Sequence, residues 1–597
     1  MHIRAFSVII CLIHCVFPLS EFGLDDEPGT PGDSSYVAAV YEHRVHLNPE
    51  PHLPQSRAAA LRHMQRNLDV YEEQAKQASA QGVQILVFPE DGIHGFNFTR
   101  ASISSYLEWI PDPKRESWNP CTEPGRYNNT DVLQQLSCMA RGYSLYLVAN
   151  MASMQPCPVA TPCPADPPCP ADPPCPAETP CPVATPCPAD PPCPADPPCP
   201  AETPCPVATP CPADPPCPAD PPCPAETPCP VATPCPADGR WQFNTDVVFS
   251  SDGQLVARYH KQNLYFEKAF DTPPREIITF NTPFAGRFGV LTCFDLMFHQ
   301  PAVTLVQKGV RQLVYPTAWM NQLPLLAAAQ IQRAFSLGAG VSVLAANIRA
   351  DQLGMTGSGI FTPAATLAHH HARPGQMEEG RLLVARVPVL DPLWLGSRAV
   401  EEEGNGGFPS SWSVAESGHC RQDENCMDSV DPPPLPVTSS SPTFNSSMMY
   451  DPFTFVLLPA AEGLLSVCQG ALCCHLEYRR WPPGGEGELY ALGAFAGTHT
   501  VNGRYALQVC ALVRCGGAEP ASCGQEVEEA ESRMDFRLSG RFQTRHVYPS
   551  LVVGGVRMEQ PRLDRRPGGT VTMERSRTEA GLLTACLYGR MYHLDQV

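Results

Sequence analysis

Two hydrophobic patterns alternate along the first part of the chain. Short apolar runs typical of buried strands are separated by segments in which apolar residues recur every three or four positions, as on one face of a helix. A first strand is predicted at 35–41 and a helix from about Gln55 to Gln81. Further strands are expected at 83–88, 143–150, 246–250, 254–258, 287–292, 311–315 and 341–346, and a second helix over about 324–337. This alternation predicts an α/β layered domain.

The pattern changes beyond about residue 390. Residues 400–445 are rich in Glu, Gly, Ser and Pro, which is typical of a linker. Short β-patterned runs follow at 453–458, 505–513 and 546–553, with cysteines clustered among them and no nucleophile–base pair visible. We therefore expect one domain over 35–390, a linker over 391–445, and a β-rich domain stapled by disulfides over 446–597.

A repeat interrupts the first domain. From Cys157 to Cys235 a cysteine recurs every six residues, always followed by proline, within a higher unit of 24 residues. Dense proline removes backbone donors and fixes φ, so neither helix nor sheet is expected there. We interpret residues 157–238 as a disordered surface loop that grew by tandem expansion. Its thiols could pair with each other, with partners, or with nothing.

Charge and targeting signals narrow the classes of function. The net charge of the 597-residue chain is −20 and no basic stripe appears, which argues against nucleic acid and anionic membranes as partners. Residues 1–20 have the length and apolar character of a signal peptide. Sequons at Asn97, Asn128 and Asn445 fit glycosylation on the secretory route, and the last residues lack the hydrophobic tail of a lipid-anchor signal. We expect a secreted, extracellular glycoprotein without a membrane anchor.

Three predicted strand ends carry side chains that together suit amide hydrolysis. Glu90 follows the strand at 83–88, Lys261 follows the strand at 254–258, and Cys293 follows the strand at 287–292. Such ends converge at one edge of an α/β sheet, where ligands bind. The Cys293 thiolate would attack the carbonyl, Glu90 would act as base, and Lys261 would stabilise the charge on oxygen. Each residue alone also has an ordinary interpretation, such as a buried cysteine or a turn.

Longer motifs around these residues resemble a known superfamily. Phe88-Pro-Glu90, Tyr259-His-Lys261 and Leu291-Thr-Cys293-Phe-Asp295 resemble the Glu–Lys–Cys signatures of the nitrilase superfamily of carbon–nitrogen hydrolases. The stretches 87–100, 315–327 and 354–360 are similar to the secreted branch that contains biotinidase and pantetheinase (vanin). The run Met-Asn-Gln-Leu-Pro-Leu-Leu-Ala-Ala at 320–328 favours the biotinidase side of that branch.

The resemblance implies a fold, an activity and a set of site residues. The fold would be a nitrilase-like αββα sandwich followed by a β-rich base domain. The activity would be hydrolysis of biotin amides, namely biocytin and biotinyl-peptides, through a thioester that could also pass biotin to another nucleophile. Glu90 would be general base, Lys261 the oxyanion-stabilising group and Cys293 the nucleophile. Glu267 and Trp319 would line the substrate site, and the chemistry would need no metal or cofactor.

The repeat is the departure from the family pattern. The family has a shorter loop with a cysteine near each end, which Cys157 and Cys235 match. Because the cost of closing a loop grows only logarithmically with its length, the expansion should leave Glu90 and Lys261 close in space. Outside the repeat and the signal segment there are twelve cysteines, and setting Cys293 aside leaves eleven. At least one of them must be free or pair with the repeat.

Two other functions stay open at this point. Pantetheine hydrolysis would use the same three residues and differ only in the amide cleaved. A non-catalytic secreted protein that cross-links partners through its Cys-Pro repeat would form covalent oligomers under non-reducing conditions. His369-His-His371 could suggest a metal site, but consecutive histidines on an extended chain alternate sides, so we interpret them as a solvated loop.

Overall fold

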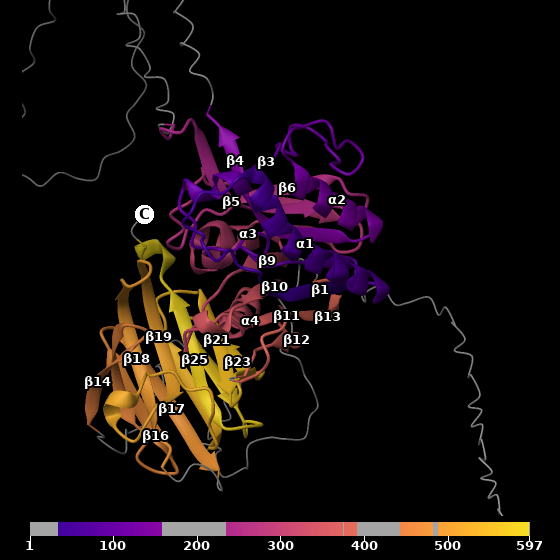
Figure 1. Ribbon diagram of the computed structural model, residues 1–597. Coiled ribbons are helices and arrows are strands. Elements are labelled where there is room, and N and C mark those ends of the chain that lie inside the picture. The colour runs from indigo at the N-terminus through magenta and orange to yellow at the C-terminus, as the bar shows by residue number, and fades with distance from the viewer. Residues whose placement is uncertain (1–33, 158–234, 374, 391–441, 482–486, 596–597) are drawn as a thin grey trace, which may run out of the picture. The chain divides into compact units, whose positions relative to one another are not determined.

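The computed structural model describes residues 34–157, 235–373, 375–390, 442–481 and 487–595 (Figure 1). The predictions for the signal peptide, for residues 158–234 of the repeat and for residues 391–441 of the linker lie outside this part of the chain. The chain divides into two compact units, residues 156–241 and the remainder. None of the described helices is long and apolar enough to cross a membrane.

The first domain is built on a sheet of 13 strands. Its main path runs in the order β6 (Leu255–His260), β5 (Arg240–Phe249), β4 (Tyr146–Pro156), β2 (Ile85–Val87), β1 (Ser35–Arg44), β10 (Ser342–Arg349), β9 (Gln312–Thr317), β8 (Gly286–Val290) and β7 (Thr279–Thr282). The central pairs from β4 to β8 that have a described register are parallel, whereas β5–β6 and β7–β8 are antiparallel. The shorter strands β3 (Glu108–Trp109), β11 (Ser358–Phe361), β12 (Thr366–His370) and β13 (Arg381–Pro388) pair off this path.

Side chains of the sheet separate into an inner and an outer core. On β1, Tyr36, Ala38 and Val40 pack in an inner core with residues of β2 and β8 to β11, so two β layers face each other there. Ala39 and Tyr41, on the opposite face of β1, pack with helices. Period-two alternation therefore assigns each strand face to one core. The predicted αββα sandwich is confirmed.

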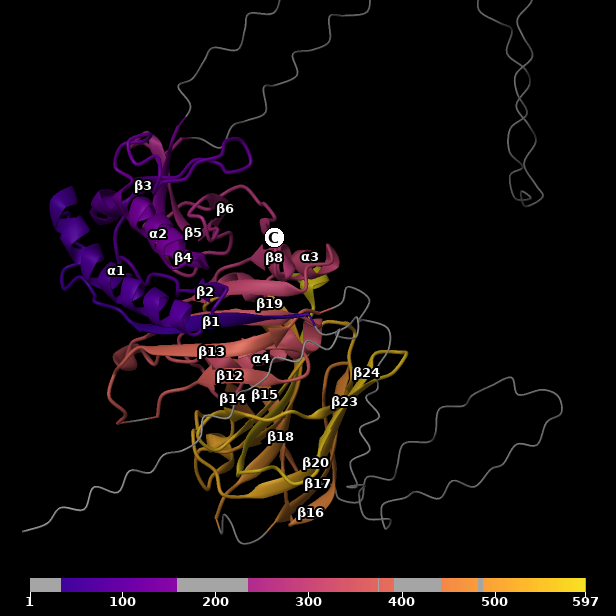
Figure 2. The ribbon, with the colours of Figure 1, turned by 90° about the vertical axis from the view of Figure 1, so that its right-hand side faces the viewer.

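Helices cover the outer faces. Figure 2 shows α1 (Arg57–Ala80) and α2 (Asp131–Gly142) against one side of the sheet, and α4 (Ala328–Ala339) packs on the other with the short α3 (Thr304–Gln307). The predicted helix at 55–81 is α1, whose N-cap Ser56 accepts a hydrogen bond from the Ala59 N–H. The other predicted helix begins at Ala328 rather than at about 324. Gln330 causes this difference, because its side chain bonds the backbone of the preceding loop at Ala327 and Pro324.

The C-terminal region is a pair of antiparallel sheets. One has the order β14 (Thr443–Met448), β15 (Asp451–Leu457), β18 (Tyr490–His499), β19 (Tyr505–Arg514), β25 (Leu582–Arg590), β21 (Val547–Val553) and β22 (Arg557–Met558). The other has the order β16 (Glu462–Gln469), β17 (Leu472–Trp481), β20 (Arg533–Arg541), β24 (Thr570–Arg575) and β23 (Arg562–Arg565). An apolar core lies between them. The predicted β-rich region is present, and its first strand begins three residues before the expected boundary at 446.

Disulfides hold this region as expected. Cys474–Cys510 joins the two sheets, and Cys468–Cys473 and Cys515–Cys523 close local loops. In the first domain Cys121 pairs with Cys138. Within the smaller unit, Cys157 pairs with Cys235. Of the cysteines in the described ranges, Cys293 and Cys586 are free and buried, so Cys586 is one unpaired thiol among the eleven that were counted.

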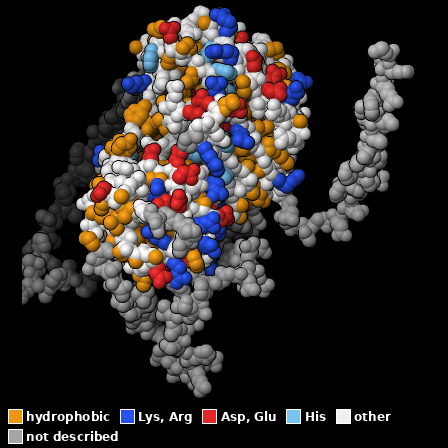
Figure 3. All heavy atoms as spheres, turned by 60° about the horizontal axis from the view of Figure 1, so that its bottom comes forward, with side chains coloured by type: hydrophobic (Ala, Val, Ile, Leu, Met, Phe, Trp, Pro, Cys, Tyr) orange, Lys and Arg blue, Asp and Glu red, His pale blue; other side chains and the backbone are white. Residues whose placement is uncertain are grey.

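The histidine run lies in a strand, which corrects the expectation of a solvated loop. His369 and His370 belong to β12, which pairs with β11 and is half-buried. Burial lowers the pKa of His370 and of His371 to about 4, so both are neutral at physiological pH. The run therefore has a structural role at the end of the sheet. Over the face of the molecule in Figure 3, acidic and basic side chains are interspersed.

Candidate active site

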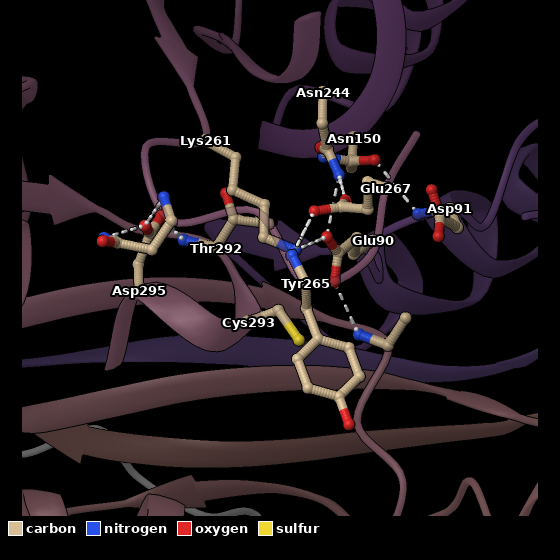
Figure 4. Close-up of polar contacts among 12 residues, drawn as sticks. Glu90, Asp91, Asn150, Asn244, Lys261, Tyr265, Glu267, Thr292, Cys293 and Asp295 are labelled. Atoms are coloured by element: carbon tan, nitrogen blue, oxygen red, sulfur yellow. Dashed lines mark hydrogen bonds and ion pairs between the residues drawn. The ribbon is translucent and has the colours of Figure 1, made fainter. Parts of the chain in front are cut away.

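The three predicted residues converge where their strands end. Glu90 follows β2, Lys261 directly follows β6, and Cys293 lies three residues beyond β8. Figure 4 shows their side chains facing one another, with Glu267 beside them. The Lys261 Nζ lies 2.6 Å from Glu90 Oε1 and 2.9 Å from Glu267 Oε2. The prediction that the ends of these strands meet at one site is confirmed.

The backbone at Cys293 is held in a sharp turn. Cys293 has φ +44°, a left-handed conformation that costs energy for a residue with a Cβ. The main chain of Thr292 and the side chain of Asp295 form a capping box, and Tyr315 donates a 2.7 Å hydrogen bond to the Cys293 carbonyl. Asp295 in turn accepts a 2.6 Å hydrogen bond from Tyr259. These contacts fix the position of the thiol at the end of β8.

Glu90 is almost completely buried, and both of its carboxylate oxygens accept hydrogen bonds. Besides Lys261, its donors are the Asn244 amide at 2.8 Å and the Ala318 N–H at 2.9 Å. Asn244 also donates to Glu267 at 2.5 Å, so one amide bridges two carboxylates. A buried carboxylate with this many donors stays in one orientation, which a base must do to reach a thiol proton.

The charges of the site set the protonation of the thiol. Burial raises the pKa of Cys293 well above its usual range, and the negative charge of Glu90 raises it further, while Lys261 and the Thr317 hydroxyl lower it. Burial also lowers the pKa of Lys261, but Glu267 and Glu90 outweigh this effect and hold that pKa well above its usual range. The site at rest therefore holds a neutral thiol and a charged ammonium, and the thiolate forms only when a base takes the proton.

A chain of buried polar side chains connects the base to the nucleophile, and the sequence analysis missed it. Asn150 accepts from the Asp91 N–H and donates to Asn244 at 2.6 Å and to Asp246 at 2.8 Å. Asp246 also accepts a 2.7 Å hydrogen bond from the hydroxyl of Thr292, which precedes Cys293. The available signal was the run Asn-Thr-Asp at 244–246, because polar residues inside a buried strand need partners.

Cys293 borders two hollows. The larger hollow has about 970 Å³ of empty space, and Glu90, Lys261, Glu267 and Lys268 line it. The smaller hollow has about 480 Å³ and a mainly apolar lining. Its lining includes Phe294, Met297, Trp319, Gln322 and Leu326 and, from the β18–β19 hairpin, His499, Asn502 and Tyr505.

The remaining predicted residues have clear positions. Trp319 is fixed on the wall of the smaller hollow, since its indole N–H donates to the Leu326 carbonyl at 2.9 Å. Asn97 is exposed at the edge of the larger hollow, and Asn128 and Asn445 are also exposed. All three sequons are thus accessible, and their glycosylation stays a prediction. Within the described residues there is no cluster of three or more His, Cys, Asp or Glu side chains that could hold a metal ion.

Comparison with known proteins gives consistent matches in both parts of the chain. Residues 229–389 match the model of the carbon–nitrogen hydrolase family, and residues 443–595 match that of the vanin C-terminal domain. The chain is similar to biotinidase from Takifugu rubripes, at 55% identity over 94% of this chain and 95% of the relative. Biotinidase from Homo sapiens is 42% identical over 94% of this chain and 90% of the relative. Pantetheinase from Mus musculus is 37% identical over the same shares.

Proposed function

Because this chain belongs to the biotinidase and vanin branch of the nitrilase superfamily, and is a carbon–nitrogen hydrolase that acts on amides, we propose that it releases biotin from biocytin and biotinyl-peptides. The observation that carries this proposal is the higher identity to biotinidases, 55% and 42%, than to a pantetheinase, 37%. The arrangement of Glu90, Lys261 and Cys293 supports the amide chemistry. It does not distinguish between the two substrates.

The first half of the reaction forms a thioester. Glu90 takes the proton of the Cys293 thiol, and the sulfur attacks the carbonyl carbon of the amide. An ammonium has three N–H donors, and Glu90 and Glu267 accept two of those of Lys261, which leaves one for the developing oxyanion. When the C–N bond breaks, Glu90 returns the proton to the departing amine. The biotinyl group then remains on Cys293 as a thioester.

The second half uses the same base. Glu90 takes a proton from water, whose oxygen attacks the thioester carbonyl, and Lys261 again stabilises the oxyanion. The C–S bond breaks, the proton returns to sulfur, and biotin leaves as the free acid. A hydroxyl or amine in place of water would accept the biotinyl group instead. Glu267 holds Lys261 in position, and Trp319 forms part of the substrate wall.

The same family membership supports a proposal for domain organisation and location. Residues 35–390 would be the catalytic domain and 446–597 the base domain of a secreted glycoprotein. The five disulfides of the described residues fit an oxidising compartment. Expression in animal cells, with the medium and the lysate probed before and after glycosidase digestion, tests secretion and glycosylation. Protein confined to the lysate, or with unchanged mobility after digestion, would contradict them.

The central experiment measures free biotin released from biocytin by the purified full-length protein. We expect release by the natural protein and none by Cys293→Ala. Cys586→Ala is the matched control, because it removes the other buried free thiol of the described residues and should leave turnover unchanged. Pantetheine is tested alongside. Cleavage of pantetheine alone would move the substrate to the vanin type and keep the mechanism, and inactivity on both would refute the substrate assignment.

A further inference from the structure

The two hollows at Cys293 have different roles in the proposed reaction. Glu90, which moves the protons onto the amine and off the water, and Lys261, which stabilises the oxyanion, line the larger hollow and not the smaller one. The amine must therefore leave, and water must enter, through the larger hollow. The acyl group stays bonded to sulfur during that exchange, so it needs separate space. The smaller hollow is this space, an assignment that rests on the proposed function.

The smaller hollow is formed partly by the C-terminal region. The hairpin between β18 and β19 contributes His499, Asn502 and Tyr505 to its wall. The hairpin turn approaches the residue after the nucleophile closely, since a Cβ on Gly503 would lie 2.8 Å from the Phe294 ring. The acyl space is thus closed by a segment about 200 residues away from Cys293 in the sequence.

This wall is held rigidly. The Asp451 carboxylate accepts a 2.8 Å hydrogen bond from the His499 Nδ1, and the rings of His499 and Tyr505 stack at 4.7 Å. Behind them the Arg590 guanidinium lies 4.8 Å from the Tyr505 ring centre. Arg590 also donates to the Met297 carbonyl at 2.9 Å and so ties the C-terminal region to the floor of the hollow. A pre-organised wall of this kind can discriminate between ligands without the entropic cost of becoming ordered on binding.

Its chemistry fits an acyl group that is apolar near the thioester and polar at its far end. Phe294, Met297 and Leu326 offer aliphatic and aromatic surface to a chain. His499 is 5% exposed, its Nδ1 is used by Asp451, and no described residue bonds its Nε2. With a proton on Nδ1, Nε2 can accept a hydrogen bond. The Asn502 amide can donate and accept beside it.

From this juxtaposition we propose that His499 determines acyl specificity by accepting a hydrogen bond from an N–H of the cyclic urea at the end of the biotinyl group. Asp451 is a positioning residue, because it fixes the tautomer of His499. The C-terminal region is then part of the substrate site. A pocket that pairs a polar group in this way favours the acyl chain that carries the group, since only that chain gains the hydrogen bond.

The test compares two amides of the same amine. One is biocytin, and the other is lysine acylated on its side chain with pentanoate, which keeps the chain and lacks the urea head. For His499→Ala we expect kcat/KM on biocytin to fall about tenfold, mostly through KM, because one buried hydrogen bond is lost. On the pentanoyl amide, kcat/KM should stay within about twofold. Asp451→Asn should lower the ratio of kcat/KM on biocytin to kcat/KM on the pentanoyl amide as well, by a smaller factor.

A control and three outcomes make the result decisive. His475→Ala is the matched control, because His475 is an exposed histidine of the same region, bonded to Ser466, and should change neither amide. Equal losses of His499→Ala on both amides would mean a structural role and overturn the proposal. An unchanged ratio with full activity would overturn it as well. Absence of biotin release by the natural protein would instead refute the proposed function itself.

Discussion

Two buried carboxylates of the same sheet differ in what surrounds them. Glu90 pairs with Lys261 at 2.6 Å and faces the hollow that contains Cys293. Glu42, near the end of β1, accepts hydrogen bonds from Thr356 and Ser358 and from the Gly357 N–H, with Arg349 3.9 Å away. It lines neither hollow. Burial and a basic partner are thus common to both, and what distinguishes the functional site is open space beside a nucleophile.

The largest expected difference between the two carboxylates is in catalysis. Glu90→Gln keeps the shape of the side chain and removes the base, so kcat/KM should fall by about a thousandfold or more. Glu42→Gln is the matched variant and should leave kcat/KM within about threefold. Steady-state biotin release by both variants, normalised to folded protein by circular dichroism, checks this. A comparable loss in Glu42→Gln would remove the distinction between the two clusters.

The next largest effect concerns Lys261, the basic partner of Glu90. Lys261→Met removes the oxyanion donor and leaves Glu90 and Glu267 buried without a counter-charge. We expect at least a hundredfold loss of kcat/KM and a loss of about 3–5 kcal/mol in the free energy of unfolding. Urea titration and activity assays on one preparation measure both quantities.

A second variant separates the two effects of that change. Replacing Glu267 by Gln in addition removes one of the two unpaired charges, so it should restore part of the stability and none of the activity. Recovery of activity in the double variant would contradict the role of Lys261. A stability unaffected by Lys261→Met would mean that the ion pairs contribute little to the fold.

A smaller effect concerns the thiol itself. The negative charge of Glu90 raises the pKa of Cys293, so Glu90→Gln should lower that pKa although it abolishes turnover. The pH dependence of iodoacetamide alkylation at Cys293, followed by mass spectrometry of its peptide, reports this value. Glu42→Gln should leave the curve in place. An upward shift in Glu90→Gln would show that Glu90 activates the resting thiol, contrary to the charge argument.

Site residues at the ends of strands could be predicted from the sequence, whereas site residues inside strands were missed. Glu90, Lys261 and Cys293 could be found because each follows an apolar run, and topology brings such ends together. Asn150, Asn244 and Asp246 lie within strands, and whether a polar residue there is buried depends on the packing of the second β layer. The hydrogen bond between Asp246 and Thr292 joins the two layers and exists only after they close, whereas Asn244 bonds Glu90 within one layer.

Contacts between distant segments were also beyond the sequence pattern. The C-terminal region showed no nucleophile–base pair, and nothing in its alternation indicated that the β18–β19 hairpin reaches Cys293. The start of α4 shifted because the Gln330 side chain bonds the loop before it. His369 and His370 joined β12 because β11 offered a strand to pair with, which a run of three histidines does not reveal.

The smallest expected effect is the pH dependence of stability that Glu42 causes. Burial raises the pKa of Glu42 to about 7 from 4.5, so the folded protein keeps a proton between these values that the unfolded chain has released. The contribution of Glu42 to the free energy of unfolding is therefore largest below pH 4.5. It declines by about 1–3 kcal/mol as the pH rises toward 7. The difference in urea unfolding free energy between pH 5 and pH 7 should shrink by this amount in Glu42→Gln. If natural protein and variant show the same difference, Glu42 is ionised throughout, held by Arg349 and its three hydrogen-bond donors. The cluster would then resemble the Glu90 site in charge as well as in burial, and only the hollow and the thiol would distinguish them.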